Sequence, residues 1–177
     1  MKIYHNKDMI FEKYIVYNEI NDRLSDIALQ INKDYVNKNP LIVGILNGSF
    51  MFLSDLSKKI NIDCEITFMK VKSYEGTKSS DKINMKLDLD QNIEGREIII
   101  IEDIGDTGRT IEYIRSILNN KNPRSIKVCT LFYKPDAFLY KNRPDFIGFE
   151  IKNEFIIGYG LDLDGKYRNL EDVYKLL

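Results

Sequence analysis

The chain has 177 residues, of which 44% are hydrophobic and 30% charged, and its formal net charge is −1. This size allows one compact domain with a substantial core, and we expect residues 1–177 to form a single domain. The near-neutral charge argues against a nucleic-acid partner. Because no apolar stretch is long enough for a signal peptide or a membrane span, we expect a cytoplasmic protein without a membrane partner.

The first half of the chain alternates helical and strand-like patterns. Apolar residues at helical spacing predict a first helix over 18–35: Ile20, Leu24, Ile27 and Ile31. The apolar run 41–46 predicts a buried strand, which is followed by a tight turn and a helix over 50–60. Strands are predicted over 64–74 and, with one face exposed, over 84–90, and a polar loop joins them.

The second half continues the alternation. Four consecutive isoleucines within 96–101 predict a central strand buried on both faces. A helix marked by Ile111, Ile114 and Leu118 follows it, and further strands are predicted over 125–133, 145–151 and 155–161. This order favours an α/β fold with a parallel sheet covered by helices on both faces. Ligands of such sheets bind at the carboxyl ends of the strands.

Three carboxylates follow the central strand where such a ligand would bind: Glu102, Asp103 and Asp106. Residues 106–110, Asp-Thr-Gly-Arg-Thr, can offer backbone N–H groups and two hydroxyls to a phosphate at the start of a helix. The Glu-Asp pair instead suits ribose hydroxyls and a hard cation such as Mg²⁺. A ligand with a phosphate, a ribose and magnesium would use both halves. The simpler alternative is a solvated acidic turn in which Asp106 or Thr107 caps the helix.

Other phosphate and metal motifs are excluded. The chain has no GxxxxGK[ST] sequence, and GYGLDLDG lacks the third glycine of a dinucleotide fingerprint. A calcium loop that started at Asp162 would need glycine and glutamate where Tyr167 and Val173 stand.

The segment IIIIEDIGDTGRT resembles the phosphoribosyl pyrophosphate motif of type I phosphoribosyltransferases. Five further segments resemble the hypoxanthine-guanine phosphoribosyltransferase family, in the family's order: VGILNGSFMFLSDL, KSYEGTKSSD, LFYKPD, RPDFIGFEI and IIGYGLDLDGKYRNL. The resemblance covers almost the whole chain from Leu41 onward and is weaker before it. It implies the type I fold, which is a parallel sheet flanked by helices with a small hood from the terminal segments.

The resemblance also implies Mg²⁺-dependent transfer of 5-phosphoribosyl from its pyrophosphate to N9 of hypoxanthine or guanine, giving IMP or GMP in purine salvage. Glu102 and Asp103 would hold the ribose hydroxyls and an associated Mg²⁺. Asp106 would act near N7 of the purine, as a general base or as a stabiliser of positive charge. The 5′-phosphate would be bound by Asp106, Thr107, Gly108, Arg109 and Thr110.

Four residues are assigned by the resemblance to the purine end of the site. Lys134 would donate to the 6-oxo group, Phe146 would stack on the base and Ile147 would offer backbone groups to its edge. Asp162 would bind a second Mg²⁺ on the pyrophosphate. The structural alternatives are a solvated lysine at a strand end for Lys134 and an ordinary core aromatic for Phe146.

The resemblance gives the pyrophosphate to Asn47, Gly48 and Arg168. Ser73 and Tyr74 would belong to a lid that closes over the site and excludes water.

Three residues depart from the family pattern. Asn47 stands where lysine is common, so only the backbone amide, which in the family often follows a non-proline cis peptide, is expected to act there. Gly105 replaces a bulkier apolar residue, which is expected to loosen the phosphate loop, and Asp81 replaces a common lid glycine. None of the three changes removes a catalytic group.

Two alternatives remain at this point. One is an enzyme on the same fold that prefers xanthine. The other is a regulatory protein that senses phosphoribosyl pyrophosphate and binds RNA or DNA, against which the near-neutral charge counts. The family also suggests a homodimer or a homotetramer.

Overall fold

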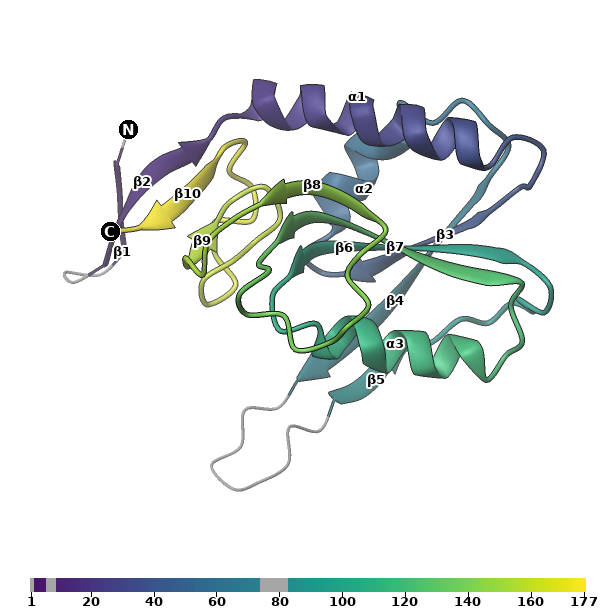
Figure 1. Ribbon diagram of the computed structural model, residues 1–177. Coiled ribbons are helices and arrows are strands. Elements are labelled where there is room, and N and C mark those ends of the chain that lie inside the picture. Colours follow the sequence, from purple (N-terminus) through teal and green to yellow (C-terminus); the bar gives the residue numbers. More distant parts are fainter. Residues whose placement is uncertain (1, 6–8, 74–82) are drawn as a thin grey trace.

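The computed structural model describes residues 2–5, 9–73 and 83–177, and in these ranges the chain forms two β-sheets and three α-helices (Figure 1). Tyr74 and Asp81, both expected in the lid, lie outside the described residues. Ser73 is the last residue of a strand, and its side chain is likewise outside the description. No helix in the described ranges is both long and apolar enough to cross a membrane.

The larger sheet has six strands in the order β5-β4-β3-β6-β7-β8. These strands are β3 (Leu41–Leu46), β4 (Glu65–Ser73), β5 (Ile83–Leu87), β6 (Glu97–Gly105), β7 (Ser125–Tyr133) and β8 (Phe146–Glu150). Neighbouring strands are parallel except β4 and β5, which are antiparallel. The strand expected over 84–90 is therefore an antiparallel edge strand on the predicted parallel sheet.

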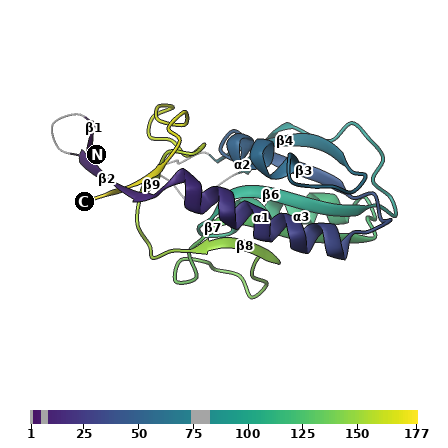
Figure 2. The same cartoon turned by 90° about the horizontal axis from the view of Figure 1, so that it is seen from above.

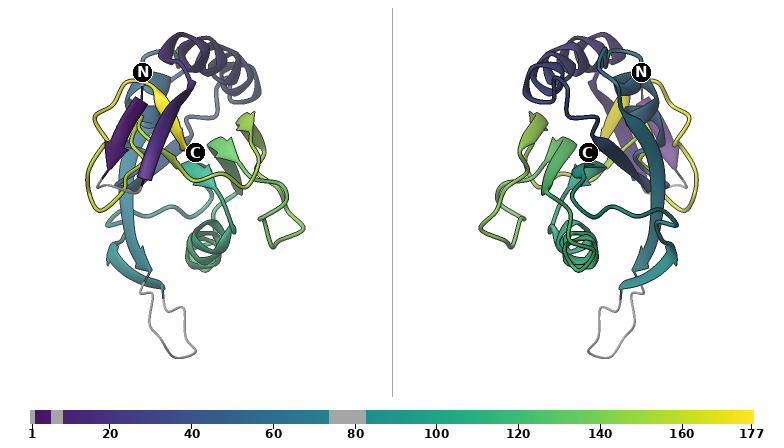
Figure 3. Two further views of the ribbon diagram at one scale, coloured as in Figure 1. Left: turned by 90° about the vertical axis from the view of Figure 1, so that its left-hand side faces the viewer. Right: turned by 90° about the vertical axis from the view of Figure 1, so that its right-hand side faces the viewer.

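Helices cover both faces of this sheet, as its continuous apolar strands require. They are α1 (Tyr17–Asp34), α2 (Phe50–Ser57) and α3 (Arg109–Asn119). Figure 3 shows α1 and α3 on opposite sides of the strands. Ile99 and Ile101 of β6 pack in the core with α1 and α2, whereas Ile98 and Ile100 pack in the core with α3. All four side chains are 0% exposed, which confirms the strand predicted from the isoleucine run.

The terminal segments form the smaller sheet, which is antiparallel and has the order β1-β2-β10-β9. Its strands are β1 (Lys2–His5), β2 (Met9–Ile15), β9 (Ile156–Ile157) and β10 (Val173–Leu176). This sheet, here called the hood, lies beyond the carboxyl ends of the parallel strands and contains the first and the last described strands of the chain (Figures 1 and 2). The hood expected from the family resemblance is therefore present.

Candidate active site

Glu102 and Asp103 lie on β6 itself, because this strand continues to Gly105 and not only to residue 101 as predicted. Glu102 is 8% exposed, and its Oε2 has no hydrogen-bond partner among the described residues. Burial, followed by the charge of Asp103 and a hydrogen bond to it, raises the pKa of Glu102 well above its usual value. Burial also raises the pKa of Asp103 to about 6. Ionising these two carboxyl groups is costly because they are buried, and a bound cation or donated hydroxyl groups would offset that cost. The pair therefore suits a site that binds a cation or hydroxyl groups.

The turn after β3 contacts the acidic strand end. A Cβ on Gly48 would lie 1.6 Å from Oδ2 of Asp103, so only glycine allows this approach. The segment between the hood strands β9 and β10 reaches the same point, since a Cβ on Gly160 would lie 2.1 Å from the carbonyl oxygen of Gly48. The peptide bond between Leu46 and Asn47 is cis, and the Asn47 side chain is exposed. Three segments that are distant in sequence therefore meet at Asp103.

Asp162 and Arg168 join this group from the hood side. The Arg168 guanidinium lies 2.6 Å from the Asp162 carboxylate and donates at 2.7 Å to the carbonyl oxygen of Gly160. Its positive charge is among the effects that lower the pKa of Asp103. The structure thus brings together the residues expected to bind pyrophosphate and the acidic pair.

The predicted phosphate loop has the expected form. Residues 106–110 follow β6 and lead into α3, whose N-cap is Gly108 with φ +80°. A Cβ on Gly108 would lie 2.5 Å from the ring of Phe138, and the Leu139 N–H donates to the Thr107 carbonyl oxygen at 3.1 Å. The segment after β7 therefore supports the loop. A hollow is lined by loop and strand residues that include Glu102, Asp106, Thr107, Gly108, Arg109 and Thr110.

Gly105 leaves no empty space in this loop. It is buried, and a Cβ there would lie 3.3 Å from Tyr133 and 3.7 Å from Phe138. These aromatic side chains occupy the room that a larger residue would need. The loosening expected from this glycine is therefore not evident in the packing.

Lys134 points at the phosphate loop and is not a solvated lysine. Only 5% of the residue is exposed, its backbone N–H donates to the Gly105 carbonyl oxygen at 3.0 Å, and its Nζ lies 3.0 Å from Oδ2 of Asp106. The Asp106 side chain is 46% exposed, so the pair sits at the rim of the site. The two residues assigned to the base thus lie together.

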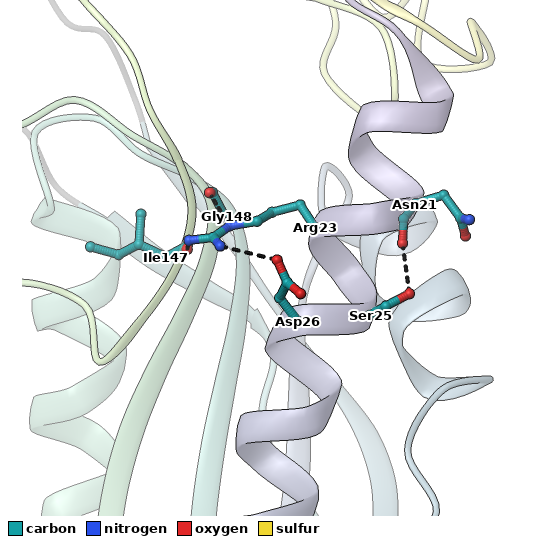
Figure 4. A network of polar contacts seen from close by, with 6 residues as sticks. All are labelled: Asn21, Arg23, Ser25, Asp26, Ile147 and Gly148. Atoms are coloured by element: carbon teal, nitrogen blue, oxygen red, sulfur yellow. Dashed lines mark hydrogen bonds and ion pairs between the residues drawn. The ribbon is translucent and has the colours of Figure 1, made fainter.

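Phe146 and Ile147 do not join this group, and their positions do not support their assignment to the purine. Phe146 pairs with Cys129 of β7, five residues before Lys134, so it lies roughly 16 Å from the carboxyl edge along the strand. It is 6% exposed and belongs to the core, which was the structural alternative. The carbonyl oxygen of Ile147 already accepts a hydrogen bond at 3.1 Å from Arg23 of α1, which also donates to Gly148 (Figure 4).

Phe155 is an exposed aromatic residue of this region to which the sequence interpretation gave no role. It directly precedes β9, it is 44% exposed, and its ring lies 6.2 Å from that of Phe11 in the hood. The Phe-Ile-Gly of 146–148 and the Phe-Ile-Ile-Gly of 155–158 are similar in sequence. Proximity to Asp162 would have favoured the second segment.

The described residues suit a Mg²⁺ ion that keeps water and substrate ligands better than they suit a metal ion bound by protein side chains alone. In the ranges described, no group of three or more His, Cys, Asp and Glu side chains could hold a metal ion. Mg²⁺ usually keeps several waters and binds to one or two carboxylates together with substrate phosphates. The unpartnered Oε2 of Glu102 and the adjacent Asp103 match that mode of binding.

The topology, the acidic strand end and the loop that leads into α3 define a phosphoribosyltransferase. A family model of the phosphoribosyl transferase domain matches residues 16–164. The hypoxanthine-guanine phosphoribosyltransferase of Streptococcus pyogenes serotype M3 is 46% identical over 154 residues, 86% of each chain. That of Lactococcus lactis is 43% identical over 167 residues, 93% of this chain and 91% of the relative. A crystal structure of a Staphylococcus aureus hypoxanthine phosphoribosyltransferase has a TM-score of 0.89 at 37% identity, and the match covers 94% of this chain and 91% of that one.

The chain therefore belongs to the hypoxanthine-guanine phosphoribosyltransferase family, and it is a pentosyltransferase with the type I fold. The matched domain begins after β2 and ends before Arg168, so it includes the acidic strand end and the phosphate loop but not the first two hood strands.

Proposed function

We propose that this enzyme transfers 5-phosphoribosyl from 5-phosphoribosyl 1-pyrophosphate to N9 of hypoxanthine or guanine, with Mg²⁺, and forms IMP or GMP. The bond between the anomeric carbon and pyrophosphate breaks with its electron pair on the leaving pyrophosphate, while a new bond forms to N9. The observation that carries the proposal is the pairing of Lys134 with Asp106 beside the phosphate loop. The names of the relatives support the same bases.

Lys134 would select the base. An ammonium has three hydrogen-bond donors and no acceptor, so it can donate to a 6-oxo group while it keeps its contact with Asp106. Asp106 would then lie on the N7 side of the purine. Its carboxylate would accept a proton there, or stabilise the positive charge that develops during transfer.

The pyrophosphate would lie between the turn after β3 and the hood. The Asn47 and Gly48 backbone would contact it from one side, and the Arg168 guanidinium from the other. Mg²⁺ held by Glu102 and Asp103, with a second ion at Asp162, would neutralise negative charge on the pyrophosphate as it leaves. The protein's part is to hold these groups around Asp103, where Gly48 and Gly160 make close contact.

The base would stack on Phe155 and not on Phe146. An aromatic side chain that is 44% exposed has a face available for a ligand, whereas Phe146 is enclosed by the core. Substitution of each phenylalanine by alanine tests which of the two stacks on the base. Phe155→Ala should raise KM for the base, and Phe146→Ala should mainly lower stability.

The test of the function is nucleotide formation. The protein, Mg²⁺ and 5-phosphoribosyl 1-pyrophosphate are mixed with hypoxanthine, guanine, xanthine or adenine, and the product is separated by chromatography. We expect IMP and GMP with hypoxanthine and guanine, and loss of both when Mg²⁺ is chelated. A clear preference for xanthine would replace the proposed substrates, and no turnover with any 6-oxopurine would overturn the proposal.

A homodimer or homotetramer, a cytoplasmic location, and a lid that includes Ser73 and Tyr74 stay predictions from the family resemblance. Sedimentation would measure the first. The regulatory alternative has no support from the relatives, which are named as enzymes.

A further inference from the structure

His5, the single histidine of the chain, is buried in the hood. It is the last residue of β1, pairs with Met9 of β2 and is 5% exposed. Its Nδ1 lies 2.8 Å from the hydroxyl oxygen of Tyr167, and its Nε2 lies 3.8 Å from the Asp164 carboxylate. Both ring nitrogens therefore face the same segment, residues 162–168.

The two residues that His5 contacts have unusual backbone conformations. Asp164 has φ +53° and Tyr167 has φ +73°, both in the left-handed region, which is disfavoured for residues with a Cβ. A segment of this shape depends on contacts from outside to keep it. The His5 ring provides one set of them, because it also packs edge-on against the Tyr167 ring with centroids 5.5 Å apart.

The segment 162–168 carries the hood's contribution to the site. Tyr167 directly precedes Arg168, whose backbone carbonyl oxygen accepts a hydrogen bond from Gly160 at 2.9 Å. The Arg168 side chain pairs with Asp162 at 2.6 Å. Any shift of Tyr167 would therefore move Arg168 relative to Asp162 and Gly160.

We propose that His5 is a positioning residue for pyrophosphate binding: it acts through Tyr167 to hold Arg168 and Asp162 toward the substrate. It contacts no substrate itself. The proposal rests on the function proposed above, which gives Arg168 and Asp162 to the pyrophosphate. It adds a role for β1, which lies outside the matched family domain.

Calorimetry of Mg²⁺-pyrophosphate binding tests this directly. His5→Ala should weaken binding roughly fivefold, the effect of one hydrogen bond, and raise KM for 5-phosphoribosyl 1-pyrophosphate to match, with kcat and KM for the base little changed. His5→Asn should restore most of the affinity, because its amide can occupy the position of Nδ1. Tyr167→Phe should reproduce the loss, and the double variant His5→Ala/Tyr167→Phe should be no worse than either single one.

Lys2→Ala is the matched control, since Lys2 is an exposed residue of the same strand and should bind as the wild type does. Wild-type affinity in both His5→Ala and Tyr167→Phe would overturn the proposal, as would strictly additive losses. If His5→Ala fails to fold, His5→Asn and Tyr167→Phe, which keep most of the side-chain volume, decide the question.

Hydrogen exchange separates this inference from the proposed function. The Lys166 N–H donates to Leu163 and the Gly165 N–H donates to Asp162 within the segment. Both should exchange faster in His5→Ala without any ligand. Faster exchange in a protein whose wild type binds no pyrophosphate would contradict the proposed function but keep the structural role of His5. Unchanged exchange would contradict that role.

Discussion

A buried ammonium discriminates between purines because it can donate a hydrogen bond to a 6-oxo group but not to a 6-amino group. We expect Lys134 to discriminate in this way. Facing the 6-amino group of adenine, it would meet another donor, and such mismatches reduce kcat/KM by about 10⁴-fold. Lys134→Gln should lower kcat/KM for hypoxanthine and guanine and narrow the gap to adenine, because an amide both donates and accepts. Lys127→Gln, on the strand that ends just before Lys134 but half-exposed and paired with Asp145, should change nothing. Efficient use of adenine by the wild type would show that Lys134 does not read the base.

Glu102 is a buried acid whose ionisation is costly in the unliganded protein, because burial disfavours its negative charge. Its Oε2 is buried without a partner among the described residues, beside a second carboxylate. Glu102→Gln removes the ionisable group, so it should raise the free energy of unfolding of the unliganded protein by on the order of 1 kcal/mol. It should also lower kcat/KM, because the ribose and Mg²⁺ lose a carboxylate. Denaturant unfolding and steady-state kinetics measure both effects, with Glu94→Gln, exposed, as the control.

At the scale of elements, hydrophobic periodicity predicted the helices and strands whose side chains pack in the core. The helices and the β6 strand follow from apolar spacing, because each of them buries a face. The continuation of β6 through Glu102 and Asp103 was not predicted, because two consecutive acidic residues are not typical of a buried strand unless they bind a ligand. Phe146 and Phe155 sit in near-identical motifs, and only the register of β8 on β7 shows that Phe146 lies far from the carboxyl ends of the strands. Strand register is a long-range property that a local motif does not contain.

The turn after β3 and the end of β6 form one unit, because Gly48 lies against Asp103. Gly48→Ala would place a methyl group on the Asp103 carboxylate, and the flexible side chain would move in response. We therefore expect a folded protein with kcat/KM reduced about 10²-fold, the penalty for a displacement of about 1 Å at a reacting centre. Gly95→Ala is the comparison, because its φ is +69° and, among the described residues beyond its chain neighbours, no atom lies within 4 Å of the added Cβ. It should lose some stability and no activity, and equal activity losses in both variants would refute the idea.

At the scale of the whole molecule, the chain ends complete the site. The hood pairs β2 with β10, and its C-terminal segment supplies Asp162, Arg168 and the close contact of Gly160 with Gly48. The N-terminal strands bind no substrate in this scheme, yet they hold the segments that do. The family resemblance is strongest from Leu41 onward, where all the residues assigned to the ligands lie. The strands β1, β2 and β10 were not predicted, since strands of four to seven residues show little periodicity.

Asp172 links the hood to the body of the protein. It accepts a hydrogen bond at 2.9 Å from the backbone N–H of Tyr17, the first residue of α1, and it forms an ion pair with Lys13 of β2. The hydrogen bond from Lys13 holds the pKa of Asp172 below its usual range. A lowered carboxyl pKa contributes stability above pH about 4, and this contribution is lost as the pH falls through the lowered value.

Asp172→Asn should therefore lower Tm by about 2 °C at pH 7, and the difference from the wild type should shrink as the pH falls below about 4. Because the hood carries Arg168, the same variant should raise KM for 5-phosphoribosyl 1-pyrophosphate more than KM for the base. Scanning calorimetry over this pH range measures the first effect and initial rates the second. Asp26→Asn removes an exposed ion pair with Arg23 and should alter neither. A Tm difference that stays constant from pH 7 to pH 3 would mean that the charge of Asp172 does not hold the hood in place.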